Sequence, residues 1–79
     1  MSREEVFERV TEVFRDVFDD ETIELADTTT AEDIEEWDSL EHVSLMLAIG
    51  SEFGIKIPLQ KVNSMKNVGE MVDYIQQTV

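Results

Sequence analysis

The sequence predicts an all-α domain: a small bundle of three main helices plus one short helix, with a long loop between the first and second main helices. Apolar residues recur at helical spacing in three segments, and each segment begins with a capping residue three positions before a Glu. Gly54 and Pro58 interrupt the chain after the second segment. A chain of 79 residues can form one core but not two, so we expect residues 1–79 to be a single domain.

The first helix is expected to begin at Ser2 and to end near Asp19. Ser2 and Glu5 have the spacing of a capping box, and the acidic Glu4 and Glu5 suit the positive end of the helix dipole. One face of this helix is apolar along its whole length. It consists of Val6, Phe7, Val10, Val13, Phe14, Val17 and Phe18. This pattern predicts a helix that packs against the core.

Residues 20–37 follow no sustained helical or strand period, so they are expected to form a loop. A loop of this length is unusual in so small a domain, and such loops are often functional. Four separated apolar side chains predict that the loop folds back over the core. They are Ile23, Leu25, Ile34 and Trp37.

The second helix is predicted to start with Asp38 as its N-cap, with Glu41 three residues on, and to end at Gly54, which suits a left-handed C-cap. Its apolar arc is unusually wide and contains Leu40, Val43, Leu45, Met46, Leu47, Ile49 and Phe53. Either the helix is central and buried on two sides, or part of this face meets a partner. Burial is the expectation for four of these residues: Val43, Met46, Leu47 and Phe53.

Two more helices are expected after Pro58. The stretch from Leu59 to Ser64 is long enough for about one or two helical turns. The last helix begins with Asn67 as its N-cap and Glu70 three residues on. Its apolar stripe is Val68, Met71, Val72, Ile75 and Val79.

Charge and composition exclude several kinds of partner and site. Nineteen Asp and Glu against six Lys and Arg give a formal net charge of −13. Nucleic acid and anionic membranes repel such a chain, whereas basic protein patches attract it. The absence of Cys and the single His exclude thiolate and multi-histidine metal sites, and Asp19, Asp20 and Glu21 lack the spacing of a calcium loop, so no metal is expected.

The chain has no apolar run of the roughly 20 residues that a membrane span needs, and its first residues do not form the apolar stretch of a signal peptide. We therefore expect a cytoplasmic protein without membrane insertion, and a monomer.

Ser39 and His42 lie three residues apart, but they do not predict catalysis. A serine nucleophile needs a base, an orienting acid, an oxyanion hole and a pocket, which so short a chain is not expected to supply. We expect no enzyme activity, and we expect His42 to pack at the edge of the apolar face or to contact a partner. A Ser in the first turn of a helix places its hydroxyl beside free backbone N–H groups, a position that suits a phosphate ester.

Three runs of residues carry a family resemblance: Trp37-Asp38-Ser39-Leu40, Glu52-Phe53-Gly54-Ile55-Lys56-Ile57-Pro58 and Val68-Gly69-Glu70-Met71-Val72-Asp73-Tyr74-Ile75. With them the chain resembles the acyl carrier protein family over nearly its whole length. The resemblance implies that a transferase attaches 4′-phosphopantetheine from coenzyme A to Ser39, and that the thiol of this group holds a cargo as a thioester. It also implies that Asp38 caps the helix and helps to engage the transferase near its magnesium ion, and that Leu40 meets partners.

Acidic residues around Ser39 predict how partners approach. They are Glu32, Asp33, Glu35, Glu36, Asp38 and Glu41. Such charges steer basic surfaces and raise association rates more than affinity, which suits a shuttle that must also release its partner. The expected partners are a phosphopantetheinyl transferase and acyl- or aminoacyl-loading and processing enzymes with basic docking patches. The residues expected to meet them are Leu40, Glu35, Glu36 and Glu41.

The chain departs from carriers of fatty-acid synthesis in three ways: its second helix holds few acids, Lys56, Lys61 and Lys66 follow that helix, and Trp37 precedes the Asp-Ser-Leu motif. These differences favour a specialised carrier of polyketide, aminoacyl or unusual acyl cargo, with a housekeeping fatty-acid carrier as the alternative. Two other classes stay open: an acidic helical interaction module that is never modified, and a small hydrolase that uses Ser39. In the family that the chain resembles, long acyl chains can lie between the helices, and the resemblance implies that Met46, Met71 and Ile75 would line such a space. The alternative is that these methionines only fill the helical core, which needs no ligand.

Overall fold

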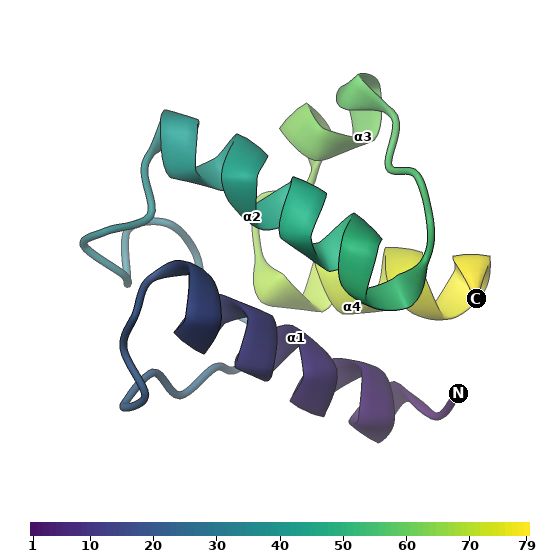
Figure 1. Ribbon diagram of the computed structural model, residues 1–79, viewed down its shortest axis with the longest axis horizontal. Coiled ribbons are helices and arrows are strands. Elements are labelled where there is room, and N and C mark those ends of the chain that lie inside the picture. Colours follow the sequence, from purple (N-terminus) through teal and green to yellow (C-terminus); the bar gives the residue numbers. More distant parts are fainter.

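The architecture is a bundle of four helices, described by a computed structural model of residues 1–79 (Figure 1). The elements are α1 (Arg3–Val17), α2 (Ser39–Phe53), α3 (Leu59–Ser64) and α4 (Val68–Thr78). The chain forms no strand, and its one isolated β-bridge pairs Thr30 with Asn67. Three longer helices, one short helix and a long first connection confirm the predicted fold class.

Side-chain caps open the three longer helices, as the sequence predicted. In each cap a side-chain oxygen accepts a hydrogen bond from the backbone N–H three residues on, at 2.8–3.2 Å. The pairs are Ser2 with Glu5, Asp38 with Glu41, and Asn67 with Glu70. At the other end of α2, Gly54 takes the left-handed conformation with φ of 65°, which a glycine adopts without steric cost.

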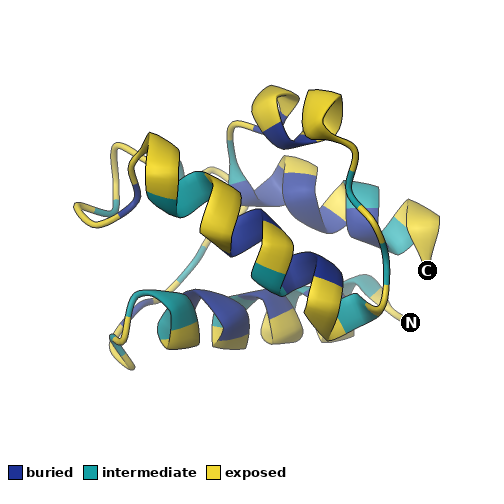
Figure 2. Cartoon of the chain, turned by 45° about the horizontal axis from the view of Figure 1, so that its top comes forward, coloured by how far each residue is buried: buried dark blue, intermediate teal, exposed yellow.

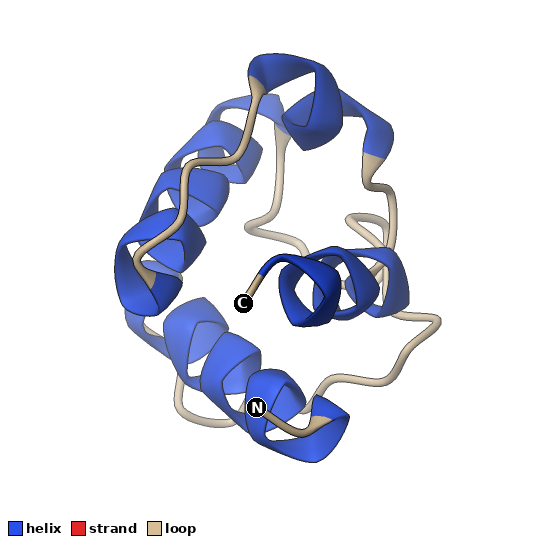
Figure 3. Cartoon of the chain, turned by 90° about the vertical axis from the view of Figure 1, so that its right-hand side faces the viewer, coloured by secondary structure: helices blue, strands red, loops and turns tan.

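The core lies between α1, α2 and α4, whose buried faces turn toward one another (Figure 2). Seen from the end that holds both termini, the helices surround one centre, with α3 lying beside α2 (Figure 3). The fully buried large side chains are Phe14, Leu45, Met46, Ile49, Met71 and Ile75 together with four valines. The predicted faces of α1 and α4 therefore supply most of the core, although Val79 lies beyond the end of α4 and is exposed rather than packed in its stripe.

Burial was predicted for four apolar residues of α2, and this prediction is wrong for Val43 and Leu47. Val43 and Leu47 are 43% and 71% exposed, whereas Met46 is buried and Phe53 is half-buried against the core. The arc of apolar residues on α2 is wider than the face that α1 and α4 cover. Because α3 has only six residues, it does not cover the rest of that arc.

The loop between α1 and α2 is held against the core by the four apolar residues that the sequence singled out. Ile23 and Trp37 are buried in the core cluster, and Leu25 and Ile34 pack against it. Thr29 is also buried, and its hydroxyl accepts a hydrogen bond from the backbone N–H of Ala26 at 2.8 Å. The predicted return of this loop over the core is confirmed.

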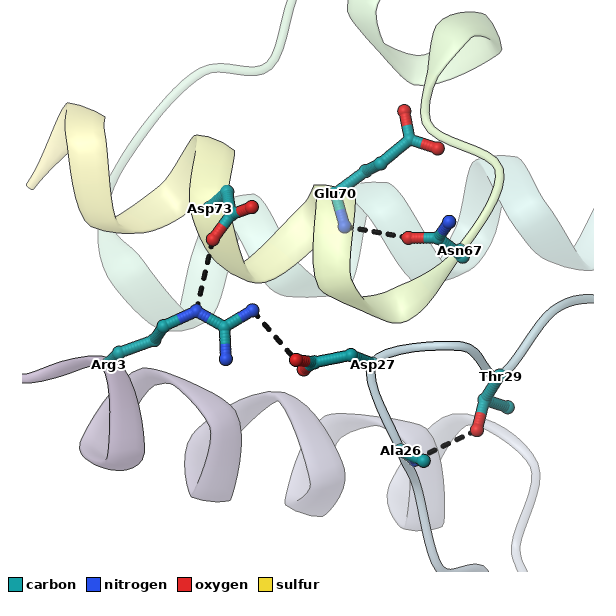
Figure 4. A network of polar contacts seen from close by, with 7 residues as sticks. All are labelled: Arg3, Ala26, Asp27, Thr29, Asn67, Glu70 and Asp73. Atoms are coloured by element: carbon teal, nitrogen blue, oxygen red, sulfur yellow. Dashed lines mark hydrogen bonds and ion pairs between the residues drawn. The ribbon is translucent and has the colours of Figure 1, made fainter.

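Polar contacts fasten the same loop to both ends of the chain (Figure 4). The guanidinium of Arg3, at the start of α1, donates to Asp27 in the loop at 3.2 Å and to Asp73 in α4 at 3.0 Å. These hydrogen bonds, first that to Asp73 and then that to Asp27, raise the pKa of the Arg3 side chain above its usual value. The backbone N–H of Gly69 donates to the carbonyl of Asp27 at 2.9 Å, so the loop is tied to α4 by main chain as well.

Candidate functional site

Ser39 is the first residue of α2, and its side chain is exposed. Asp38 precedes it in an extended conformation, and the Asp38 carboxylate accepts a hydrogen bond from the N–H of Glu41 at 2.8 Å. The cap therefore occupies the Asp38 side chain and leaves the neighbouring hydroxyl of Ser39 in solvent. This hydroxyl lies at the positive end of the helix dipole, where a negatively charged substituent is stabilised. In Figure 1 the start of α2 lies at the end of the bundle opposite to the two termini.

Trp37 and His42 fix the main chain on both sides of Ser39. The indole Nε1–H of Trp37 donates to Nδ1 of His42 at 3.0 Å, and Nε2–H of His42 donates to the carbonyl of Val62 in α3 at 2.7 Å. The Trp37 ring also meets the edge of Phe14 in α1, with ring centroids 5.1 Å apart. One histidine thus connects the loop, α2 and α3, which agrees with the prediction that it packs at the edge of the apolar face.

The acids that precede α2 face solvent. Glu32, Asp33, Glu35, Glu36 and Asp38 are exposed, and Glu41 is half-buried. Asp33 is engaged locally, because its carboxylate accepts a hydrogen bond from the N–H of Thr30 at 2.9 Å. None of the four ion pairs in the chain involves an acid of this group. These acids, here called the acidic surface, therefore face solvent without an ion-pair partner.

Three exposed apolar residues of α2 lie on one helical face next to this acidic surface. Leu40, Val43 and Leu47, here called the α2 strip, are 81%, 43% and 71% exposed and are spaced by three and four residues. No charged residue occurs on α2 between Glu41 and Glu52, and Glu52 is paired with Arg9 at 3.4 Å. Beyond its first turn and before Glu52, the exposed residues of α2 are therefore uncharged: Val43 and Leu47 are apolar, and the others are Ser44 and Ser51.

A shallow hollow of about 470 Å³ opens beside Ser39. Ser39 and His42 line it from α2, and Asn63, Met65 and Lys66 line it from the end of α3 and the link to α4. The remaining lining residues are Ala31, Trp37 and Asp38. We call this depression the Ser39 hollow.

A second groove, of about 560 Å³, runs between α2 and the α3 side of the bundle. Apolar side chains dominate its lining, among them Val43, Met46, Leu47, Ile57 and Leu59. Gly50 also lines it, and a Cβ at Gly50 would lie 2.8 Å from the carbonyl oxygen of Ile55. The absence of a side chain therefore lets residues 54–57 cross close to α2.

The expectation that Met46, Met71 and Ile75 would line a space for an acyl chain stays a prediction. Met46 lines the groove between α2 and α3, whereas Met71 and Ile75 are fully packed inside the core, at 0% and 1% exposure. Both residues belong to the core cluster, and a core stripe has the same helical spacing as the lining of a ligand space.

Sequence reasoning missed two features of the site. Lys66 and Ser39 line the same hollow although the two residues are far apart in the chain, and His42 is joined to Val62 of α3 by a hydrogen bond. Neither pair has a regular spacing that could have predicted it. No three His, Asp or Glu side chains come together as a metal site would require. None of the helices combines the length and apolar character that crossing a bilayer demands.

A family model, curated relatives and a solved structure all match this chain. The family model described as a phosphopantetheine attachment site matches residues 8–75. The acyl carrier protein of Lactobacillus acidophilus is 30% identical over 96% of this chain and 95% of its own length. That of Thermosynechococcus vestitus is 32% identical over 100% of this chain and 98% of its own. The solution NMR structure of a holo acyl carrier protein from Geobacter metallireducens superposes with a TM-score of 0.84 at 38% identity, covering 91% of this chain and 83% of that one.

Proposed function

The chain belongs to the family of proteins with a phosphopantetheine attachment site, and we propose that it is an acyl carrier protein whose prosthetic group is bound to Ser39. The observation that carries the assignment of Ser39 is its place as the exposed first residue of α2, directly after a cap that uses the Asp38 carboxylate. We propose that residues 1–79 act as one carrier domain that binds its cargo and presents it to separate enzymes, without catalysing a reaction itself.

The residues around Ser39 fit a phosphodiester. When bound, 4′-phosphopantetheine supplies the thiol that this Cys-free chain lacks, and the cargo is held there as a thioester. Attachment joins the Ser39 oxygen to the phosphorus next to pantetheine in coenzyme A. The bond from that phosphorus to the adenosine-bearing phosphate breaks, the nucleotide leaves with the electron pair, and the serine proton passes to a base of the transferase. The start of α2 supplies backbone N–H groups and a dipole that stabilise the added negative charge.

Partner enzymes are proposed to dock on the acidic surface and the α2 strip together. Glu35, Glu36 and Glu41 would attract the basic patch of a transferase or processing enzyme, and Leu40 would contact its apolar surface. Because such charges at the edge of an interface mainly raise the association rate, the carrier can visit several enzymes and leave each of them. Asp38 would lie close to the magnesium ion of the transferase while its carboxylate caps α2.

A specialised pathway is favoured over housekeeping fatty-acid synthesis. The observation behind this preference is the outer face of α2, which carries no charge between Glu41 and Glu52. Partners of such a carrier would depend on apolar contact along α2 and on ion pairs only near its start. We propose that this carrier acts as a monomer in the cytoplasm.

Intact-mass measurement tests the attachment site. The purified chain is incubated with coenzyme A, magnesium and a broad-specificity phosphopantetheinyl transferase, alongside Ser39→Ala and the matched control Ser44→Ala, which also changes an exposed serine of α2. We expect one added phosphopantetheine on the native chain and on Ser44→Ala, and none on Ser39→Ala. If no variant gains mass while a control carrier does, an unmodified acidic interaction module becomes the better explanation. A gain on Ser39→Ala would place the group elsewhere.

A further inference from the structure

The Ser39 hollow is lined both by the proposed attachment site and by a lysine. Lys66 and Ser39 both line it, although they belong to different parts of the chain. The hollow has a defined shape because the Trp37–His42–Val62 hydrogen bonds hold its α2 side against α3. Its floor includes Met65, which is 5% exposed and belongs to the core cluster.

The positive charge of Lys66 lies where a group attached to Ser39 would add a negative charge. A phosphodiester on Ser39 would add a negative charge where Glu35, Glu36, Asp38 and Glu41 already repel it. Lys66 is the one lysine or arginine that lines the hollow, and no acid of the chain pairs with it. His42 also lines it, but both of its ring nitrogens are hydrogen-bonded within the chain.

The other basic residues lie elsewhere. The three arginines all belong to α1 and form ion pairs. Lys61 lies 5.8 Å from the centre of the Tyr74 ring, and Lys56 lines the separate groove between α2 and α3. Lys66 is therefore the basic group placed to offset a charge on Ser39.

We propose that the ammonium group of Lys66 pairs with the phosphodiester on Ser39 and holds the first part of the pantetheine arm in the Ser39 hollow. Asn63 lines the same hollow with an amide that can hydrogen-bond to the amides of the arm, and Met65 offers an apolar contact for its methyl groups. This inference rests on the proposed modification of Ser39 and adds a resting position for the arm. The basic patch of a docking enzyme would compete with Lys66 for the phosphodiester and so release the arm.

Paired apo and holo samples of the native chain, Lys66→Gln, Lys66→Arg and the control Lys56→Gln test this inference. Lys56→Gln removes the same charge from an exposed lysine that does not line the hollow. Intact mass first establishes that each holo sample carries one group. A sample that gains no mass tells against the modification of Ser39, not against the role of Lys66. Equal far-UV circular dichroism spectra show that the variants are folded.

Amide NMR spectra of the apo and holo forms then give the decisive comparison. We expect modification to shift the amide signals of residues 63, 65 and 66 in the native chain, in Lys66→Arg and in Lys56→Gln. In Lys66→Gln these shifts should disappear while those of residues 38–41 remain. High salt should reduce the shifts in the native chain, because it screens an exposed ion pair. Shifts that stop at residue 41 in every sample, or that persist in Lys66→Gln, would overturn the proposal.

Discussion

The substitution His42→Phe tests whether the link between the loop, α2 and α3 stabilises the fold. It keeps an aromatic ring beside Trp37, whose centroid lies 5.8 Å from that of His42, but it removes both ring nitrogens. Trp37 is 3% exposed, so its indole N–H would lose its acceptor in a buried place. Leaving such a donor unpaired costs about 1–3 kcal/mol, and the lost bond to the Val62 carbonyl adds roughly 0.5–1.5 kcal/mol.

We therefore expect His42→Phe to lower the free energy of unfolding by about 2–3 kcal/mol. In a domain of this size that loss corresponds to a fall in Tm of roughly 8–24 °C. The assay is urea unfolding followed by circular dichroism of the helices, which does not depend on the single tryptophan. Ser44→Ala, an exposed change on the same helix, serves as the control and should alter stability by less than about 0.5 kcal/mol.

A double-mutant cycle with Trp37→Phe separates the two hydrogen bonds of His42. In the Trp37→Phe background no indole N–H is present, so His42→Phe should cost only about 1 kcal/mol, for the bond to Val62. If His42→Phe costs the same in both backgrounds, the bond between Trp37 and His42 is not coupled as the geometry implies. A cost below about 0.5 kcal/mol in the native background would refute the reasoning altogether.

Three further predictions concern a close backbone approach, a perturbed pKa and the net charge of the chain. Gly50→Ala should lower the free energy of unfolding by about 1–3 kcal/mol, because its Cβ would lie 2.8 Å from the Ile55 carbonyl oxygen; unchanged urea unfolding would contradict this close approach. The Thr22 hydroxyl first, and then its backbone N–H, lower the pKa of Asp20 below its usual value. The associated stability is present above the unfolded pKa of Asp20 and is lost as pH falls through the folded one. Thr22→Val should accordingly raise the Asp20 pKa toward its usual value in an NMR titration, and an unmoved titration would exclude the hydroxyl as the cause. Added salt should raise the Tm of this chain of net charge −13, and an unchanged Tm would count against strong self-repulsion.

Local signals were sufficient to predict the helices. A cap such as Asp38 to Glu41 depends on residues three positions apart, and an apolar face repeats every three to four residues, so both are visible in the sequence. The same signals located Ser39 at the start of a helix. The end of α1 was predicted less closely: the helix ends at Val17, two residues before the predicted end. Asp19 takes a positive φ of 51°, and no glycine marks this position in the sequence.

The width of the apolar arc on α2 could not be interpreted without the neighbours of that helix. Val43 and Leu47 have the character of core residues, yet whether an apolar side chain is buried depends on which elements cover it. The short α3 leaves them exposed and creates the groove beside them. Their exposure changes the prediction for partners, since an apolar face is available where the sequence predicted core.

The helical bundle, the acidic character and the serine at the start of α2 are all readable from the order of the amino acids, because each depends on residue type and on spacing within a turn or two of helix. Two features emerge only from the packed molecule: Lys66 and Ser39 line one hollow, and His42 connects Trp37 with Val62. Contacts between segments far apart in the chain depend on how the helices pack, and packing follows from the whole core rather than from any local pattern.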